Sequence, residues 1–297
     1  MKEFSCSPKL STLASLFEAY KYQGDVNHIT GAVHHLALVL DKSKTIITIH
    51  DIRNYEKEYN GLKKKLYGLL WFTLPCKKAK IITTISKFSK QKLVDTFSIS
   101  PSKIKVIYNP APLDFEYSEN EFNEDKPVIL QIGSAPHKNL SRLIKAINEK
   151  DFRLLLIRNE DQDIKERLER KNIEYEWYSN ISREKVYECY IKSDFVFFAS
   201  EYEGFGLPIL EANAVGRPVV TSNIGPMPEV AGDSALLVDP FSVNEIRNAL
   251  LKFKNDDELR KDLIKKGLEN LSRFKSSKIA NDYLAVYQQV AKNQTKN

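Results

Sequence analysis

Residues 194 to 212 read "DFVFFASEYEGFGLPILEA", and the pattern changes from strand to helix within this stretch. The apolar, aromatic "DFVFFAS" is typical of a buried strand in a parallel sheet. Pro208 suits the first turn of a helix, where its missing N–H costs nothing, so a helix is expected from about Gly206. Glu203 and Gly204 therefore fall in the loop at the carboxyl end of a strand, where open α/β sheets bind ligands.

The residue types of this loop suit a phosphorylated polyol. Gly204 and Gly206 let the backbone approach a ligand without a Cβ clash. The N–H groups at the helix start, together with the positive end of the helix dipole, predict a phosphate site. Glu203 before the helix and Glu211 in its second turn can accept hydrogen bonds from hydroxyl pairs, as in ribose recognition. A sugar nucleotide fits this pattern, and a solvent-facing capping arrangement of the two glutamates is the alternative.

A second strand–turn–helix unit supports the sugar-nucleotide interpretation. In "LQIGSAPHKNLSRLIKAI", residues 130 to 147, Gly133 and Ser134 form the turn and Lys138 lies just before the helix. Lys138 can therefore lie over the same strand ends and neutralise a diphosphate as a point charge. Taken alone, Lys138 would be interpreted as a solvated surface lysine.

Short β-rich runs alternate with helical segments, which predicts an α/β protein built from βαβ units with parallel sheets. An acidic, proline-containing stretch at 109–127 is typical of a linker. We therefore expect one domain at 1–108, a second at 128–273, and a C-terminal helix and tail at 274–297. The expected strands lie at 25–30, 44–51, 79–86, 104–109, 128–133, 152–158, 173–178, 194–200, 218–222 and 235–239, and residues 256–293 are expected to be helical throughout.

The composition is that of an ordinary globular protein. The chain has 297 residues, 42% of them hydrophobic and 28% charged, which indicates about two domains. Its net charge of +6 is too modest to indicate nucleic acid. Cys6, Cys76 and Cys189 are far apart, so we expect three reduced thiols rather than disulfides or a zinc site. No apolar signal segment is recognised, and the apolar stretch 66–75 is too short to span a bilayer, so a cytoplasmic location is expected.

Residues 61–94 contain nine lysines and no acidic residue. These lysines flank the apolar, aromatic "LYGLLWFTLP", which suggests docking on an anionic membrane surface at the inner face of the membrane. A buried helix with a rim of solvated lysines explains the pattern equally well. Nucleic-acid binding is not expected, because no base-stacking aromatic module accompanies the lysines.

Together these motifs resemble the retaining glycosyltransferases of the GT-B fold, specifically the group 1 family. Glu203 and Glu211 match its Glu-x7-Glu motif. The similarity extends over about residues 25–290 through "GPMPEVAGDSALLVDP", "GSAPHKN", "KIKVIYNP", "TIHDI" and "TTISKFSKQKL". It implies a GT-B type fold, in which two Rossmann-like parallel-sheet domains face each other across a cleft. The second domain would bind the nucleotide-sugar donor and the first a glycan or lipid-linked acceptor.

The resemblance also implies roles for single residues. Glu203 would contact hydroxyls of the donor sugar, Glu211 the ribose and Lys138 the phosphates. His50, in "TIHD", matches a histidine that lines the reaction centre, although a histidine at a strand end can also simply cap backbone groups. The remaining donor-binding positions would be Gly133, Ser134, Gly204, Phe205, Gly206 and Leu207, with backbone amides of the last three holding the diphosphate. His28, His34 and His35 are expected to be structural.

The chain departs from the family pattern at two places. Ser134 stands where many members carry an arginine, so neutralisation of the phosphates would depend more on Lys138. Nothing before residue 25 resembles the strand and glycine-rich loop that usually open the first domain; residues 7–25 are instead expected to form one helix. The first domain is therefore expected to lack its opening βα units.

The implied activity is transfer of a sugar, with retained anomeric configuration, in cell-surface polysaccharide synthesis. No suitably placed Asp-x-Asp pair is present, since "NDDE" at 255–258 belongs to a late helical stretch, so metal-independent transfer is expected, with no cofactor beyond the donor. The alternative is a truncated, non-catalytic relative that binds a nucleotide sugar. A dinucleotide oxidoreductase ranks last, because the chain lacks a GxGxxG turn.

Overall fold

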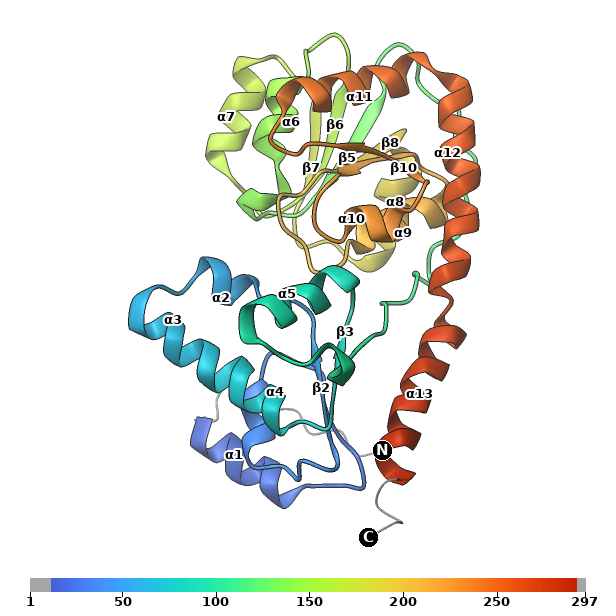
Figure 1. Ribbon diagram of the computed structural model, residues 1–297. Coiled ribbons are helices and arrows are strands. Elements are labelled where there is room, and N and C mark those ends of the chain that lie inside the picture. Colours follow the sequence, from blue (N-terminus) through green and yellow to red (C-terminus); the bar gives the residue numbers. More distant parts are fainter. Residues whose placement is uncertain (1–11, 293–297) are drawn as a thin grey trace. The chain divides into compact units, whose positions relative to one another are not determined.

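The computed structural model describes residues 12 to 292, which form two compact units (Figure 1). Among these residues, unit 1 extends to Asn109 and also includes the segment from Ser276 onward, and unit 2 is Pro110–Lys275. Each unit is built on an all-parallel sheet, and each of the ten expected strands is present. The predicted α/β architecture is therefore confirmed.

The sheet of unit 1 has four strands in the order β1-β2-β3-β4. β2 and β3 are buried along their whole length, as expected for strands covered on both faces. The strand bounds are β1 Asn27–Ile29, β2 Thr45–Ile49, β3 Ile81–Thr84 and β4 Ile104–Val106. The other elements are α1 Thr12–Lys21, η1 His34–Leu38, α2 Arg53–Lys57, α3 Gly61–Tyr67, η2 Gly68–Thr73, α4 Leu74–Lys78, α5 Lys87–Phe97, η3 Pro101–Lys103 and α13 Ser276–Lys292.

Alternate residues of β2 and β3 face two different hydrophobic clusters. Ile47 and Ile82 pack with residues of α1, η1, η2, α4 and α5. Ile46 and Ile81 point to the other face and pack with Val286 and other residues of α13. Because successive side chains of a strand point to opposite faces, the two clusters lie on opposite sides of the sheet. The C-terminal helix α13 therefore completes the core of unit 1.

His28 connects the sheet of unit 1 to α13. Its Nδ1 lies 2.8 Å from the hydroxyl of Tyr287, and its Nε2 lies 2.7 Å from Thr48 Oγ1. Burial, with a smaller contribution from the charge of His50, lowers the pKa of His28 from 6.5 to about 4. His28 is therefore held in its neutral form, in agreement with the structural role expected for it.

Acid is expected to destabilise unit 1 through His28. Between its folded pKa of about 4 and the ordinary value of 6.5, the unfolded chain binds more protons, so the free energy of unfolding falls as the pH is lowered through this window. One pKa unit corresponds to about 1.4 kcal/mol, so His28 accounts for a loss of about 2 to 3 kcal/mol. Denaturant unfolding at about pH 7.5 and about pH 4.5 measures the loss. His28→Gln, which does not titrate, is expected to show a smaller loss, and an equal loss in both proteins would contradict the assignment.

The sheet of unit 2 has six strands in the order β10-β9-β8-β5-β6-β7. The chain starts at β5 in the middle, moves outward through β6 and β7, then returns to β8 on the other side of β5. This is the doubly wound order, and its direction reverses between β5 and β8. The bounds are β5 Val128–Ile132, β6 Arg153–Ile157, β7 Tyr175–Tyr178, β8 Phe195–Phe198, β9 Val219–Ser222 and β10 Ala235–Val238.

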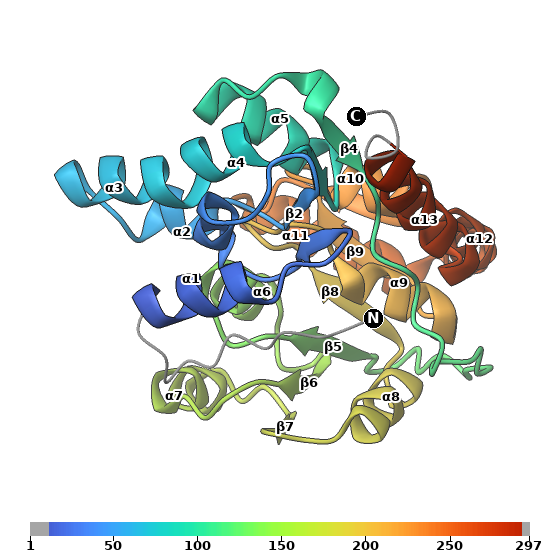
Figure 2. The same cartoon turned by 90° about the horizontal axis from the view of Figure 1, so that it is seen from below.

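Helices cover both faces of this sheet (Figure 2). Residues of α6, α7 and α11 build the largest cluster together with the strands, while α8, α9 and α10 lie on the other side. The bounds are η4 Pro136–Lys138, α6 Leu140–Ala146, α7 Gln162–Arg170, α8 Arg183–Lys192, α9 Leu207–Val215, α10 Met227–Ala231, α11 Val243–Asn255, α12 Asp257–Asn270 and η5 Leu271–Phe274.

The boundaries between the two units differ from the domain boundaries expected from the sequence. Most of the expected linker 109–127 belongs to unit 2, because it is packed there: Phe115 contacts the rings of Tyr187 and Tyr190. The expected C-terminal segment 274–297 also does not stand apart, since α13 shares a core with unit 1.

The late helical stretch is interrupted rather than continuous. α12 ends at Asn270, a 3-10 turn follows, and Lys275 adopts an extended conformation with φ −59° and ψ 132° before α13 begins at Ser276. The expectation that residues 256–293 are helical throughout is therefore wrong at Lys275, while the stretches on both sides of it are helical.

Cys76 and Cys189 are buried free thiols, while Cys6 lies outside the described residues. Burial raises the pKa of Cys76 to about 12 and that of Cys189 to about 11, so neither favours the reactive thiolate. Among the helices within residues 12–292, none combines the length and the apolar character needed to cross a membrane.

Candidate functional site

The loop between β8 and α9 adopts a conformation that requires glycine. Gly206 is the N-cap of α9, with φ 119° and ψ 47°, and its carbonyl accepts a hydrogen bond from the N–H of Ile209 at 3.0 Å. A Cβ at Gly206 would also lie only 3.2 Å from Ile209 Cδ1. The expected helix start at this residue, with Pro208 in the first turn, is confirmed.

The amino end of α9 lies at the carboxyl edge of the sheet and has no side-chain cap among the described residues. The N–H of Leu207 has no acceptor within the helix, and Pro208 has no N–H. Residues 209–215 are all buried, so the helix is firmly held. Phe205 is buried too and packs edge-on against Phe274 at 5.8 Å between ring centroids, which anchors the preceding loop.

Lys138 and Glu203 meet at the switch point of the sheet. Lys138 Nζ donates a hydrogen bond to Glu203 Oε1 at 2.6 Å and lies 5.0 Å from the centre of the Phe198 ring. Their side chains are only 21% and 15% exposed, so Lys138 is not a solvated surface lysine. The Lys138 side chain passes directly over Gly133, whose φ is 109°. A Cβ at this position would lie only 2.8 to 3.0 Å from the aliphatic carbons of Lys138, so glycine is required there.

The two strand-end loops are fixed to each other across the switch point. Asn139 is buried in a left-handed conformation, and its side-chain amide donates to the carbonyls of Ala199 and Pro240 at 2.9 and 2.7 Å. The N–H of Glu201 also donates to the carbonyl of His137 at 2.8 Å. The Lys138–Glu203 pair therefore lies on a preorganised support.

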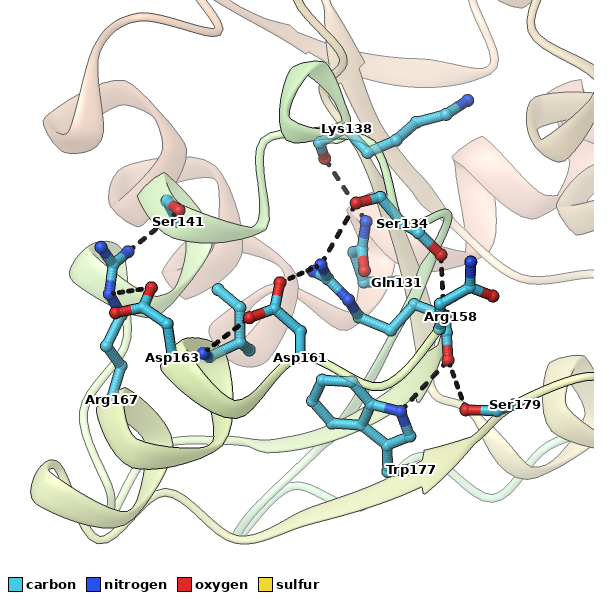
Figure 3. A network of polar contacts seen from close by, with 12 residues as sticks. Gln131, Ser134, Lys138, Ser141, Arg158, Asp161, Asp163, Arg167, Trp177 and Ser179 are labelled. Atoms are coloured by element: carbon cyan, nitrogen blue, oxygen red, sulfur yellow. Dashed lines mark hydrogen bonds and ion pairs between the residues drawn. The ribbon is translucent and has the colours of Figure 1, made fainter.

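Figure 3 shows how the turn at Ser134 is held. Ser134 Oγ accepts from the N–H of Asn159 at 2.7 Å, and its carbonyl accepts from Arg158 Nη2 at 3.2 Å. Arg158, at the end of β6, is buried, pairs with Asp161 at 2.9 Å and lies over the Trp177 ring. The guanidinium of Arg158 therefore places a positive charge beside the turn, although position 134 is a serine. Arg158 directly follows the apolar run of its strand and was not predicted as a site residue.

Glu211 is buried in the second turn of α9, which excludes the solvent-facing alternative for this residue. Its Oε1 accepts from Arg183 Nη1 at 2.6 Å and its Oε2 from the hydroxyl of Tyr190 at 2.7 Å. Arg183 also pairs with Asp114 at 2.8 Å. No sequence signal marks Tyr190 or Asp114. Arg183 could have been recognised, because a basic residue at the start of a helix is unusual.

The histidines of unit 1 differ in exposure. His50 is exposed at the carboxyl end of β2, and its Nε2 lies 3.0 Å from the carbonyl oxygen of Thr30. His28 and His34 are held by neighbouring groups, with His34 Nδ1 3.1 Å from the carbonyl oxygen of Trp71. His35 is buried against the Trp71 ring, and neither of its ring nitrogens has a hydrogen-bond partner among the described residues. Within 12–292 no group of three or more His, Cys, Asp or Glu side chains is arranged to hold a metal.

A doubly wound sheet with a glycine turn, a lysine and a helix amino end at its switch point is a nucleotide-binding type of α/β unit. The chain belongs to the glycosyl transferases group 1 family, which residues 114–270 match, and residues 7–115 match glycosyltransferase family 4. Its two parallel-sheet α/β domains are those of the GT-B fold.

Relatives and solved structures agree with this assignment. The O-antigen chain mannosyltransferase B of Escherichia coli is 29% identical over 255 residues, covering 78% of this chain and 66% of that protein. The chain thus spans about two thirds of the length of this relative. The sucrose-phosphate synthase of Thermosynechococcus elongatus superposes with a TM-score of 0.81 at 20% identity, over 94% of this chain and 77% of that one. Anabaena Alr3699/HepE, solved in complex with UDP, superposes with a TM-score of 0.75 at 17% identity, over 98% of this chain and 85% of that one.

Proposed function

We propose that this protein transfers a sugar, with retention of anomeric configuration, from a nucleoside-diphosphate sugar to a glycan or lipid-linked acceptor in cell-surface polysaccharide synthesis. The family and the O-antigen mannosyltransferase relative support the reaction class. The UDP bound in one structural neighbour supports a nucleotide donor. The observation that carries the proposal for this chain is the Lys138–Glu203 pair beside the amino end of α9.

The diphosphate of the donor would lie between Lys138 and the first amides of α9. Lys138 supplies a positive charge, and the N–H groups of Gly206 and Leu207 with the helix dipole supply directed donors. Without a ligand, Glu203 is the counter-ion of Lys138 at 2.6 Å. When a phosphate of the donor replaces Glu203 as the ion-pair partner of Lys138, the carboxylate of Glu203 becomes available to accept hydrogen bonds from hydroxyls of the donor sugar. Glu211, one helical turn further on, would accept from the ribose.

The transfer step needs no protein nucleophile. The acceptor hydroxyl attacks the anomeric carbon from the face that the diphosphate leaves, and the bond between this carbon and the phosphate oxygen breaks. The bonding electrons stay on the departing phosphate oxygen, which then takes the proton of the acceptor hydroxyl. Lys138 and the helix amides stabilise the charge that develops on this oxygen, so no metal is required. His50, exposed at the end of β2, remains the candidate of unit 1 for positioning the sugar.

A panel of nucleotide sugars tests the proposal. UDP-, GDP- and ADP-sugars are incubated with the protein in EDTA, and release of nucleoside diphosphate is measured with and without polyprenyl-diphosphate or glycan acceptors. We expect release from one donor class, stimulated by acceptor. Binding by calorimetry without turnover would support the alternative of a non-catalytic nucleotide-sugar-binding relative. Absence of binding for every donor would contradict the proposed function.

We further propose that unit 1 docks on an anionic membrane surface, where a lipid-linked acceptor would reside. The run α3–η2–α4 buries Phe72 and Cys76 in the core, so the buried-helix interpretation holds for that face. A different face is exposed and apolar: the leucine face consists of Leu62, Leu66, Leu69 and Leu74, with exposed fractions of 82%, 54%, 44% and 38%. The exposed Lys63, Lys65 and Lys77 flank it, which is the arrangement of an interfacial amphipathic helix.

Replacing three leucines of this face by serine is expected to weaken vesicle binding about tenfold for each leucine that inserts into the membrane, because each buried leucine contributes about 1.5 kcal/mol or more. Co-sedimentation with phosphatidylcholine vesicles, with and without phosphatidylglycerol, measures binding of the wild type and of Leu62→Ser/Leu66→Ser/Leu69→Ser. Leu284→Ser, which changes a leucine 51% exposed on α13, is the matched control. Failure of the wild type to sediment with the anionic vesicles would contradict membrane docking.

A further inference from the structure

Arg183 occupies a position that is unfavourable for a cation. It is the first residue of α8, where the helix dipole disfavours positive charge. Its side chain is nevertheless well held: the guanidinium carbon lies 4.0 Å from the centre of the Phe115 ring, and its nitrogens bond two carboxylates. Specific partners therefore hold Arg183 at a position that the helix dipole disfavours, which indicates a functional role.

The contacts of Arg183 fix one side of the Glu211 carboxylate. Arg183 Nη1 donates to Glu211 Oε1 at 2.6 Å, and the hydroxyl of Tyr190 donates to Oε2 at 2.7 Å. The Glu211 side chain is 11% exposed, so it cannot be solvated freely. Each carboxylate oxygen can accept a second hydrogen bond, so both retain the capacity to bind a ligand hydroxyl. Two donors on different oxygens also determine the plane of the carboxylate.

Asp114 in turn fixes Arg183. Its Oδ2 accepts from Arg183 Nε at 2.8 Å and its Oδ1 from Nη2 at 3.4 Å, which is a two-point contact on one edge of the guanidinium. The third nitrogen, Nη1, is thereby left to Glu211. The hydrogen bond from Arg183 holds the pKa of Asp114 below its ordinary value, so this carboxylate stays charged at neutral pH.

We propose that Arg183 is a positioning residue for recognition of the donor ribose, acting through Glu211 and itself oriented by Asp114. This inference rests on the proposed function, in which Glu211 accepts the ribose hydroxyls. Arg183 compensates the negative charge of the nearly buried Glu211 carboxylate and holds this carboxylate in one orientation. The two remaining acceptor sites of Glu211 can therefore bind a diol without reorganisation. Without Arg183, only Tyr190 directs the carboxylate.

Nucleotides with and without ribose hydroxyls test this role. Calorimetry with UDP, GDP and ADP first identifies the base that the wild type binds, and the 2′,3′-dideoxy form of that nucleotide is then compared with the ribose form. We expect the wild type to prefer the ribose form and Arg183→Gln to lose about tenfold in affinity for it, the worth of one charged hydrogen bond. The affinity of Arg183→Gln for the dideoxy form should hardly change, so its preference for the ribose form should be about tenfold smaller than that of the wild type. Arg183→Lys should restore part of the preference, and Asp114→Asn should reduce it less than Arg183→Gln does.

Arg167→Gln is the matched control, because Arg167 is 40% exposed against 43% for Arg183 and also pairs with an aspartate, Asp163, at 3.0 Å. It should leave the ribose preference unchanged. If Arg183→Gln lowers the melting temperature but keeps the wild-type preference, Arg183 is only structural and the inference is overturned. If the wild type binds a nucleotide without preferring ribose, the inference fails while the proposed function stands. If it binds no nucleotide, both fail.

Discussion

Lys138→Met lowers kcat/KM for the donor about a thousandfold, the loss expected when a group that stabilises charge on the leaving diphosphate is removed. Methionine keeps the unbranched shape of the side chain, which passes over Gly133 and reaches the Phe198 ring. The ammonium group alone is lost, and Glu203 is left as a mostly buried carboxylate that repels the diphosphate. Steady-state kinetics with the donor identified from the panel measure the effect.

Lys145→Met is the matched control, since Lys145 is an exposed lysine on the following helix, α6. It should leave kcat/KM unchanged. A Lys138→Met protein that is folded, as judged by its thermal unfolding, and retains near wild-type kcat/KM would remove Lys138 from the site.

Arg217→Met is expected to lower the free energy of unfolding of unit 2 by about 3 kcal/mol or more, because several buried carbonyls lose a charged hydrogen-bond donor. Arg217 is 2% exposed, and within residues 12–292 every hydrogen bond of its guanidinium goes to a backbone carbonyl. Methionine would fill much of the volume, but these carbonyls would lose the donors of Arg217. Tyr190 and Val215 keep a second donor, from Ser193 and from Ser118, whereas each carbonyl left unpaired costs about 1 kcal/mol or more. The carbonyls belong to Ser118, Tyr190, Ile191, Ser193, Val215 and Gly216, at 2.7 to 3.5 Å.

Denaturant unfolding of the two proteins checks this value. Arg247→Met is the comparison, because Arg247 is 35% exposed, its ion pair with Asp151 is loose at 3.7 Å, and it donates to one backbone carbonyl, that of Ala146 at 2.9 Å, against six for Arg217. It should cost less than about 1 kcal/mol, as exposed pairs do. Equal losses for the two variants would show that the carbonyl network of Arg217 does not stabilise unit 2.

The parts of the fold that follow from local pattern were predictable. Strands such as β8 are apolar runs bounded by turn residues, and their alternation with helices predicts parallel sheets. The site elements Gly206, Pro208 and Lys138 follow from turn and helix-start chemistry. The structure brings Lys138 to the same strand ends as Glu203, although the ion pair between them was not predicted. These features depend on short-range sequence, which a single chain displays directly.

The features that were missed depend on contacts between distant residues. The sequence predicts a C-terminal helix within 274–297 but not that Val286 packs with Ile46. The membership of this helix in unit 1 was therefore not foreseen. Arg217 precedes a strand in an ordinary "GRPVV" and shows no sign of being buried. The partners of Glu211 come from α8, and their approach depends on how α8 and α9 pack.

A crystal structure of the protein with the nucleoside diphosphate that binds tightest tests the central claim most directly. We expect diphosphate oxygens within hydrogen-bond distance of Lys138 Nζ and of the backbone nitrogens of Gly206 and Leu207, with the ribose hydroxyls on Glu211. A nucleotide bound elsewhere on unit 2, with Lys138 still paired to Glu203 and the amino end of α9 unoccupied, would contradict the account.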